Sequence, residues 1–416
     1  MCAGQTRAST SCARMDTSLR CQPFWEVRSF ATAMWIASGR YKQDSRCFRM
    51  ETISLCGFCF KGGGYTLSRE SQAMSYWWLI PAVAIISLCL TAGLRRYALA
   101  LSIIDVPNAR SSHSVPTPRG GGVAIVVAFL LSLPLLGWGN LVPWEALAAF
   151  GGAGGVVAVI GFMDDHGHIA ARWRLLGHFS AGAWALFWFG GLPSVAVIGW
   201  TVDLGWIGHL LGVIYLVWML NLYNFMDGID GIASVEAICA CLGACLLYWL
   251  GGFAELLWAP LILAMAVAGF LYWNFPPARI FMGDAGSGFL GITLGMISFQ
   301  AAWVSSQLLW GWLILLGVFI VDATFTLLRR LVRGDKVYEA HRSHAYQYAS
   351  RMVGKHLPVT LTVGGINLFW LLPIGICVTK FGLDGALGLM IAYVPLIVLA
   401  IKFHAGELEK APSSNI

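Results

Sequence analysis

The chain has little charge. Only 12% of its 416 residues are charged and 58% are hydrophobic, with a mean hydropathy of +0.70. A soluble domain carries about 25% charged residues. The apolar residues also come in blocks long enough to cross a bilayer. This composition excludes a soluble globular protein, and the function has to be read from the few polar residues. We expect a lipid bilayer as the surroundings and no nucleic-acid partner.

The sequence also lacks a cysteine framework. Six of its 11 cysteines fall in the first 73 residues, and the other five lie inside apolar runs, where they indicate packing. The CGFC at Cys56 and Cys59 is followed by no second ligand pair at metal spacing. We expect residues 1–73 to be a disordered tail or an extension translated from a misplaced start. Residues 74–405 are expected to form the transmembrane domain and 406–416 a short tail on its cytoplasmic side.

Eleven apolar segments follow Met74. They predict an all-α fold, a polytopic membrane bundle of about 11 transmembrane helices. The segments are 75–95, 121–139, 147–163, 174–190, 207–223, 232–250, 256–273, 287–302, 309–330, 358–378 and 384–403.

Lys and Arg are distributed unevenly around these segments. From Met74 onward there are 17, and with 11 spans 16 of them fall on one side, with only Lys380 on the other. The basic side is therefore predicted to be cytoplasmic. Five polar clusters lie on that same side, which predicts a single site there. They are residues 105–122, 161–168, 221–231, 274–288 and 339–347.

Carboxylates stand out in two of the clusters. Asp164 and Asp165 end an apolar segment, and adjacent carboxylates can hold a divalent cation or act as a base; the alternative is a solvated loop pair. Asn224, Asp227 and Asp230 follow one another at three-residue spacing and share a helix face. A metal or a polar ligand would satisfy this second group, and the alternative is a hydrogen-bond network between helices.

The remaining clusters supply groups that suit phosphates. MGDAGSG (282–288) is a glycine-rich turn entering a helix, with Asp284 inside it, and helix N-termini favour phosphate. Arg279 can pair with phosphate and Phe281 can stack on a base. The basic loop 105–122, which contains Arg119, is typical of a segment that covers anionic headgroups or a ligand.

Histidines and arginine mark the last cluster. His341, Arg342 and His344 suit phosphate contact, although a zinc pair and a solvated basic loop remain alternatives. Clustered carboxylates and basic groups at headgroup depth together predict phosphoryl transfer involving a lipid phosphate.

Four motifs in this order resemble the polyprenyl-phosphate N-acetylhexosamine-1-phosphate transferases (glycosyltransferase family 4). The motifs are GFMDD, NLYNFMDGIDG, PPARIFMGDAGS and HRSHAYQ. The resemblance covers residues 75–403 and implies the superfamily of phospho-N-acetylmuramoyl-pentapeptide transferase, in an O-antigen-initiating subgroup. It implies transfer of an N-acetylhexosamine 1-phosphate from a UDP-N-acetylhexosamine to undecaprenyl phosphate. Mg²⁺, which Mn²⁺ could replace, is the implied cofactor.

The resemblance also assigns roles. Asp164 and Asp165 match the catalytic pair, and Asn224 and Asp284 match the metal ligands. The substrate-binding assignments, which join residues matched to the family motifs with neighbouring candidates, are Asp227, Asp230, Asn274, Arg279, Phe281, His341, Arg342 and His344.

One position departs from the family pattern. The cell-wall branch has a lysine three residues after its aspartate pair, where this chain has His168. That difference argues against the muramoyl-pentapeptide substrate. The expected location is the bacterial inner membrane, with the active site facing the cytoplasm, and a homodimer is a further hypothesis. Two other classes stay open, a secondary transporter and a non-catalytic scaffold for polysaccharide assembly.

Overall fold

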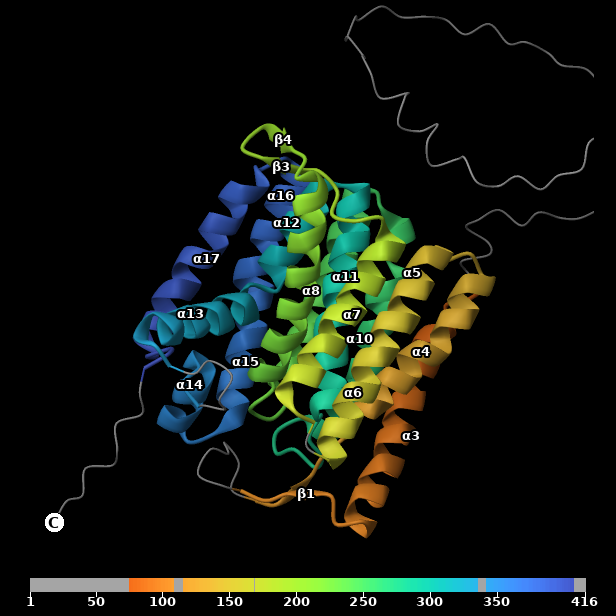
Figure 1. Ribbon diagram of the computed structural model, residues 1–416, viewed down its shortest axis with the longest axis vertical. Coiled ribbons are helices and arrows are strands. Elements are labelled where there is room, and N and C mark those ends of the chain that lie inside the picture. The colour runs from red at the N-terminus through yellow and green to blue at the C-terminus, as the bar shows by residue number, and fades with distance from the viewer. Residues whose placement is uncertain (1–74, 108–114, 168, 336–341, 408–416) are drawn as a thin grey trace, which may run out of the picture. The chain divides into compact units, whose positions relative to one another are not determined.

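The described part of the chain is almost entirely helical (Figure 1). The computed structural model describes residues 75–107, 115–167, 169–335 and 342–407, so the prediction for residues 1–73 lies outside it. The helices are α3 (Leu79–Ala100), α4 (Val123–Trp138), α5 (Trp144–Ala149), η1 (Phe150–Gly154), α6 (Gly155–His166), α7 (Ala171–Phe189), α8 (Gly205–Met226), α9 (Ile232–Gly251), η2 (Ala254–Leu256), α10 (Trp258–Asn274), α11 (Asp284–Val304), α12 (Ser306–Leu315), α13 (Gly317–Arg333), α14 (Ala345–Val353), α15 (His356–Ile366), η3 (Asn367–Leu371), α16 (Leu372–Phe381) and α17 (Gly385–Lys402). Two antiparallel hairpins complete it, β1 (Ile104–Asp105) with β2 (Thr117–Pro118) and β3 (Val195–Val197) with β4 (Trp200–Val202).

Every predicted apolar segment falls on a helix or a run of helices, which confirms the all-α membrane bundle. By length and composition, eight of the described helices or helix runs can cross a membrane, or nine if α12 and α13 form one span. The 16-residue α4 is a shorter apolar helix, and α7 carries Arg172, Arg174 and His178 among its apolar residues. The predicted number of 11 spans is therefore not confirmed.

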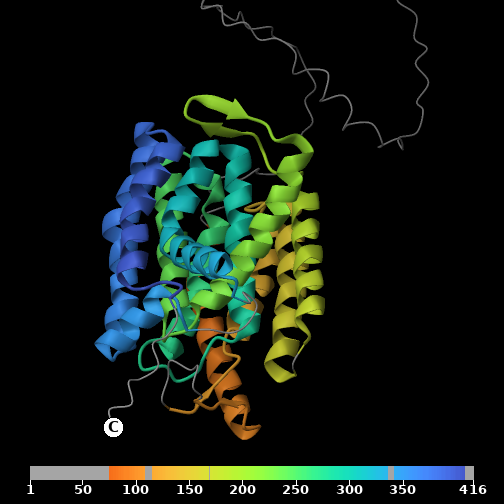
Figure 2. The same cartoon turned by 60° about the vertical axis from the view of Figure 1, so that its left-hand side comes forward.

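The segment 309–330, expected to be one span, is broken. α12 and α13 meet at Leu316 with a bend of 71°, and α13 lies across the bundle (Figures 1 and 2). The reason lies in the second half of the segment, where Asp322, Arg329 and Arg330 interrupt the apolar pattern. An averaged hydropathy does not register such a one-sided polar face.

Helix α11 forms the centre of the bundle, and nearly all of its residues are buried. It packs along α8 and α6. At Gly161 of α6, an added Cβ would lie 2.5 Å from the backbone nitrogen of Ala285, so only glycine permits this approach. The close contact places the C-terminal end of α6 against the N-terminal end of α11.

The two ends of the bundle differ in character. The β3–β4 hairpin caps one end, while β1 and α14 lie at the other (Figure 1). The second end also contains the C-terminus of α6 and the N-terminus of α11, where the polar clusters of the sequence meet.

Candidate active site

Asp165 joins α6 to α11. Its carboxylate accepts hydrogen bonds from the backbone nitrogens of Asp284 (3.1 Å) and Ala285 (3.3 Å). These are amides of the first turn of α11, which have no partner within the helix. Gly283, just before the helix, has φ +80°, and a Cβ there would lie 2.6 Å from Asp165 Oδ2. The glycine-rich turn therefore lets a carboxylate reach a helix N-terminus, where negative charge is favoured.

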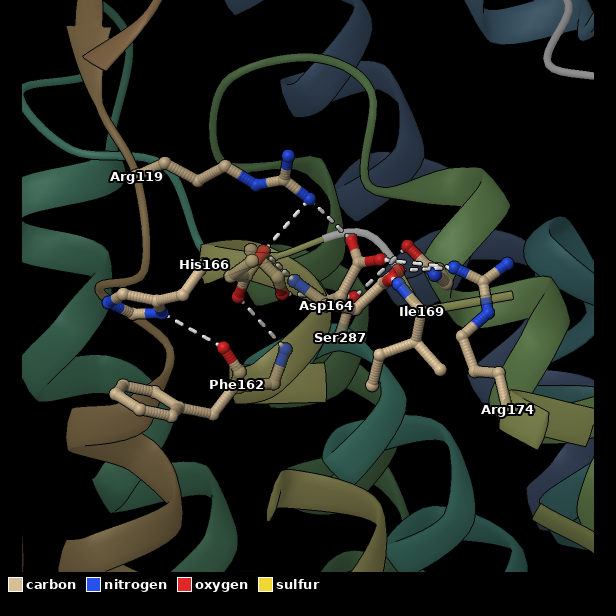
Figure 3. A network of polar contacts seen from close by, with 12 residues as sticks. Arg119, Phe162, Asp164, His166, Ile169, Arg174 and Ser287 are labelled. Carbon is tan, nitrogen blue, oxygen red and sulfur yellow. Dashed lines mark hydrogen bonds and ion pairs between the residues drawn. The ribbon is translucent and has the colours of Figure 1, made fainter. Parts of the chain in front are cut away.

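Two guanidinium groups approach these carboxylates from opposite sides (Figure 3). Arg119 Nη2 lies 2.6 Å from Asp284 Oδ1 and 2.9 Å from Asp165 Oδ1. Arg174 Nη1 donates to Asp164 Oδ2 and lies 3.7 Å from Asp284 Oδ2. The backbone nitrogen of Ile169 also donates to Asp164, at 2.9 Å. Three carboxylates from two helices thus share two cations.

Exposure separates the members of this cluster. The side chains of Asp165 and Asp164 are 2% and 7% exposed, that of Asp284 is 18% exposed, and those of Arg119 and Arg174 are 36% and 32% exposed. Burial lowers the pKa of Arg119, but attraction to Asp284, Asp165 and Asp105 and the hydrogen bond to Asp284 together outweigh it, so the pKa is raised overall. The carboxylates are thus more buried than the two guanidinium groups, which are partly exposed to solvent.

The C-terminal end of α8 borders the same cluster. Asn224 lies within this helix, but Asp227 and Asp230 come after its last residue, so the three do not share one helix face as predicted. Asn224 Oδ1 accepts a hydrogen bond of 3.3 Å from Ser287 Oγ on α11. Asp227 follows the last residue of α8, and burial, followed by repulsion from Asp284, raises the pKa of its carboxyl to about 7.

A cavity of about 460 Å³ opens near Asp230 and Phe281, both of which line it. Asp230 Oδ2 accepts from the backbone nitrogen of Ala278 (3.0 Å), and Oδ1 lies 3.1 Å from His356 Nδ1. The wall also includes Thr117. A flat ring and a fixed carboxylate in one cavity suit a nucleobase with hydrogen-bonding edges.

Two of the predicted substrate-binding residues, Asn274 and Arg279, have partners within the chain. Asn274 is 3% exposed; its Oδ1 accepts from Gly231 N (3.0 Å) and its Nδ2 donates to Ile280 O (3.1 Å). It therefore joins the loops that carry Asp230 and Phe281. Arg279 lies with its guanidinium 4.6 and 4.5 Å from the ring centroids of Tyr272 and Trp273, and it is not a cavity-lining residue.

The histidine cluster is divided. His341 lies outside the described residues. His344 is 3% exposed, and its Nδ1 lies 3.3 Å from Asp322 Oδ1 on α13. Arg342 is half-buried, and its carbonyl oxygen accepts from Arg351. His344, just before α14, therefore helps to attach the start of that helix to α13.

Sequence reasoning missed four residues as members of the site or its support, namely Arg119, Ser287, Asp322 and His356. Asp322 offered a signal, because a lone carboxylate inside an apolar run needs a partner. Arg119 also offered one, because it lies in a Gly- and Pro-rich basic loop. Ser287 lies in the glycine-rich turn 282–288, which the sequence did point to, whereas His356 offered no signal, since its role depends on a neighbour far along the chain.

The donor groups fit a magnesium ion that is shared with a substrate. Among the residues that the structure describes, no three Asp, Glu, His or Cys side chains converge as a complete metal site. Mg²⁺ commonly takes only one or two carboxylates, and substrate phosphates and water supply its other ligands. Asp284 and Asn224 offer hard oxygen donors of this kind, and Asn224 is bonded to Ser287, which lies one turn after Asp284 on α11.

The apolar bundle with a polar site at one end defines a multi-pass membrane protein. The family model "Glycosyl transferase family 4" matches residues 147–302. The "Probable undecaprenyl-phosphate N-acetylglucosaminyl 1-phosphate transferase" of Bacillus subtilis is 30% identical over 265 residues, which cover 62% of this chain and 73% of that protein.

Two further relatives agree. The decaprenyl-phosphate N-acetylglucosaminephosphotransferase of Mycolicibacterium smegmatis is 32% identical over 303 residues (62% of this chain, 73% of the relative). The phospho-N-acetylmuramoyl-pentapeptide-transferase of Moorella thermoacetica is 34% identical over 196 residues (44% and 60%). The chain therefore belongs to glycosyl transferase family 4, within the superfamily that the sequence motifs predict.

Proposed function

We propose that this protein transfers an N-acetylhexosamine 1-phosphate from a UDP-sugar to undecaprenyl phosphate. The products are the undecaprenyl-diphosphate sugar and UMP. The relatives named above act, by their names, on polyprenyl phosphates with N-acetylglucosamine. The observation that carries the proposal is the junction of α6 and α11, where Asp164, Asp165 and Asp284 share two guanidinium groups near a cavity of nucleoside size.

The cavity would take the uridine end of the donor. Phe281 offers a face for the base, and Asp230 offers a carboxylate whose position is fixed by Ala278 and His356. Asn274 would act indirectly by holding the two loops together. The diphosphate would then lie toward Asp284, because Phe281 and Asp284 are three residues apart on the same turn.

The reaction is a substitution at phosphorus. An oxygen of the lipid phosphate attacks the β-phosphorus, and the bond from that phosphorus to the oxygen bridging the two phosphates breaks. UMP leaves with that oxygen, and the bond to the sugar stays intact. Arg174, held by Asp164, is placed to receive the phosphate of the lipid, and Asp164 orients it. Positioning and charge neutralisation supply most of the catalysis in such reactions.

Mg²⁺ would be held by Asp284 and Asn224 and would neutralise charge on the departing UMP. Mn²⁺ should replace it, because both ions accept oxygen ligands in octahedral geometry. The side chains that surround this position, Asp165 and Ser287, keep the two ligands in place.

The surroundings follow from the acceptor. Because an isoprenoid cannot leave the bilayer, we propose that the polar end of the bundle lies at the cytoplasmic face of a bacterial inner membrane. The excess of Lys and Arg on that side supports this orientation. We further propose a first membrane step in O-antigen synthesis or that of a related surface polysaccharide, and a homodimeric assembly.

A test uses the purified full chain in detergent with undecaprenyl phosphate, Mg²⁺ and a panel of UDP-N-acetylhexosamines. UMP release that requires the lipid phosphate is the expected result, and the sugar that is used fastest identifies the donor. The same mixture without the lipid is the control. Absence of UMP release with every sugar would overturn the proposed function. Because no gradient is present, a transporter would release no UMP here.

A further inference from the structure

Arg119 occupies a position that the proposed reaction leaves unexplained. Its Nη2 lies 2.6 Å from Asp284 Oδ1, the carboxylate expected to hold the metal. A magnesium ion lies about 2.1 Å from its oxygen ligands. A guanidinium and a divalent cation on the same carboxylate would repel each other across a few ångströms, where the interaction between charges is strong. The two cations therefore compete for Asp284.

The backbone that carries Arg119 is fixed. Phe281 N donates to Pro118 O (2.8 Å), Gly121 N donates to Phe281 O (2.9 Å), and Gly122 N donates to Met282 O (2.8 Å). These bonds tie both flanks of Arg119 to the turn that leads from the cavity to Asp284. A displacement of Arg119 from Asp284 would therefore be a side-chain rotation over this turn, with the Cα held in place.

The side chain is partly open to solvent. It is 36% exposed, whereas the Asp165 carboxylate below it is 2% exposed. Thr117, two residues before Arg119, lines the cavity together with Phe281. If it turned away from Asp284 toward Thr117, the guanidinium would enter the space between cavity and carboxylates, where the proposed function puts the diphosphate. A planar guanidinium matches phosphate oxygens with two hydrogen bonds.

We propose that Arg119 is a resident counter-ion. It neutralises Asp165 and Asp284 until a divalent cation arrives, then yields Asp284 and binds the diphosphate of the incoming nucleotide sugar. Arg174 is the fixed member of the pair, because its main partner is Asp164 and its distance to Asp284 is 3.7 Å. This inference rests on the proposed function for the identity of the diphosphate, but the competition for Asp284 can be measured without it.

The first experiment measures Mn²⁺ binding to the purified full chain in detergent, without nucleotide, from the electron paramagnetic resonance signal of free Mn²⁺. Arg119→Met should bind Mn²⁺ about tenfold more tightly than the wild type, because a competing charge is removed. Arg119→Lys, which keeps the charge, should stay within about twofold of the wild type. The matched control is Arg96→Met, which removes the same charge from an exposed position on α3.

The second measurement separates this role from a structural one. In Arg119→Met, the KM for the UDP-sugar should rise about tenfold, since a phosphate ligand is lost. A purely structural ion pair would instead weaken Mn²⁺ binding and lower thermal stability. Unchanged or weaker Mn²⁺ binding in Arg119→Met, with Arg96→Met unchanged, would overturn the proposal.

A third measurement needs no variant. Phenylglyoxal modifies accessible arginines, and peptide mass spectrometry reports its extent at Arg119. Mn²⁺ alone should increase modification of Arg119 and leave that of Arg96 unchanged, and UDP-sugar added afterwards should protect Arg119. No increase with Mn²⁺ would contradict the displacement. If the wild type released no UMP but showed the Mn²⁺ effects, the proposed function would fail and the competition would stand.

Discussion

In two helices of this protein, the first backbone amides donate hydrogen bonds to a buried carboxylate of another helix. Asp165 of α6 accepts hydrogen bonds from the first amides of α11, those of Asp284 and Ala285. Asp322 of α13 accepts hydrogen bonds from the first amides of α14, those of Ala345 and Tyr346, both 3.0 Å. In each case a distant carboxylate satisfies donors that the helix itself leaves unpaired.

The two carboxylates differ in their remaining partners. Asp322 receives the Thr326 hydroxyl at 3.2 Å and the His344 ring at 3.3 Å, and these neighbours are themselves buried. Asp165 instead receives Arg119, which is partly exposed and shared with Asp284. A buried carboxylate in an apolar chain is therefore not in itself a sign of catalysis. The candidate site is the place where the paired cation is partly exposed.

The largest effect on activity is expected in the cluster of Asp164, Asp165 and Asp284. Asp284→Asn should lower kcat at least about 10³-fold, because the amide carries no charge to hold a metal. Transfer from the UDP-sugar in detergent measures the loss. Thermal melting should show a folded protein, since the backbone amides of α11 still reach Asp165.

A matched control for that variant is Asp335→Asn, which removes a carboxylate paired with Arg333 at the end of α13. It should keep nearly full activity. Normal turnover by Asp284→Asn would remove Asp284 from the site.

Substitution of Asp322, whose side-chain partners are buried, should lower the stability of the protein. Asp322→Asn leaves some of its donors without an acceptor, at a cost of about 1–3 kcal/mol each. A lower Tm in detergent is expected. Because Tyr346 Oη donates to Phe225 O (3.0 Å), α14 also supports the segment before Asp227, so kcat should fall moderately.

Binding of Mn²⁺ should be unaffected by Asp322→Asn if the two carboxylates are separate units. A loss of Mn²⁺ affinity as large as that in Asp284→Asn would show that they act as one, and the comparison would fail. Thr326→Val, which removes only one neutral donor, is the milder companion variant.

The cavity provides a smaller effect. Phe281→Leu keeps an apolar side chain but loses the flat face, and stacking on a base contributes about 1–3 kcal/mol. The KM for the UDP-sugar should rise roughly 5- to 150-fold, with kcat changed less. Steady-state UMP release gives both constants. An unchanged KM would show that the nucleobase lies elsewhere.

The smallest effect belongs to an exposed ion pair. Arg329 Nη2 lies 2.8 Å from Glu407 Oε1, and both side chains are well exposed. Glu407→Gln should change the free energy of unfolding by less than about 1 kcal/mol. Chemical denaturation in mixed micelles measures this value. A loss of stability as large as that of Asp322→Asn would show that exposure does not predict how much a carboxylate contributes to the free energy of unfolding here.

Much of the site could be predicted from the chain alone. Asp164, Asp165 and Asp284 stand out as candidates because charge is rare in this sequence and each lies at the edge of an apolar block. The structure brings them together at one helix junction. The prediction for Asn274, by contrast, named a substrate contact, and its amide is used by the chain itself. Sequence spacing does not reveal whether a polar side chain is already satisfied.

The sequence by itself determined the class of molecule, the helical segments and the residue types that can handle phosphate. These follow from composition and local periodicity, which each segment carries independently of the others. Only the tertiary structure decided three further features. They are the bend between α12 and α13, the ion pair of Arg119 with Asp284, and the hydrogen bonds that surround Asp322 with buried side chains. Each depends on which groups meet across long stretches of chain. Burial and the available hydrogen-bond partners then determine how firmly a charged side chain is fixed.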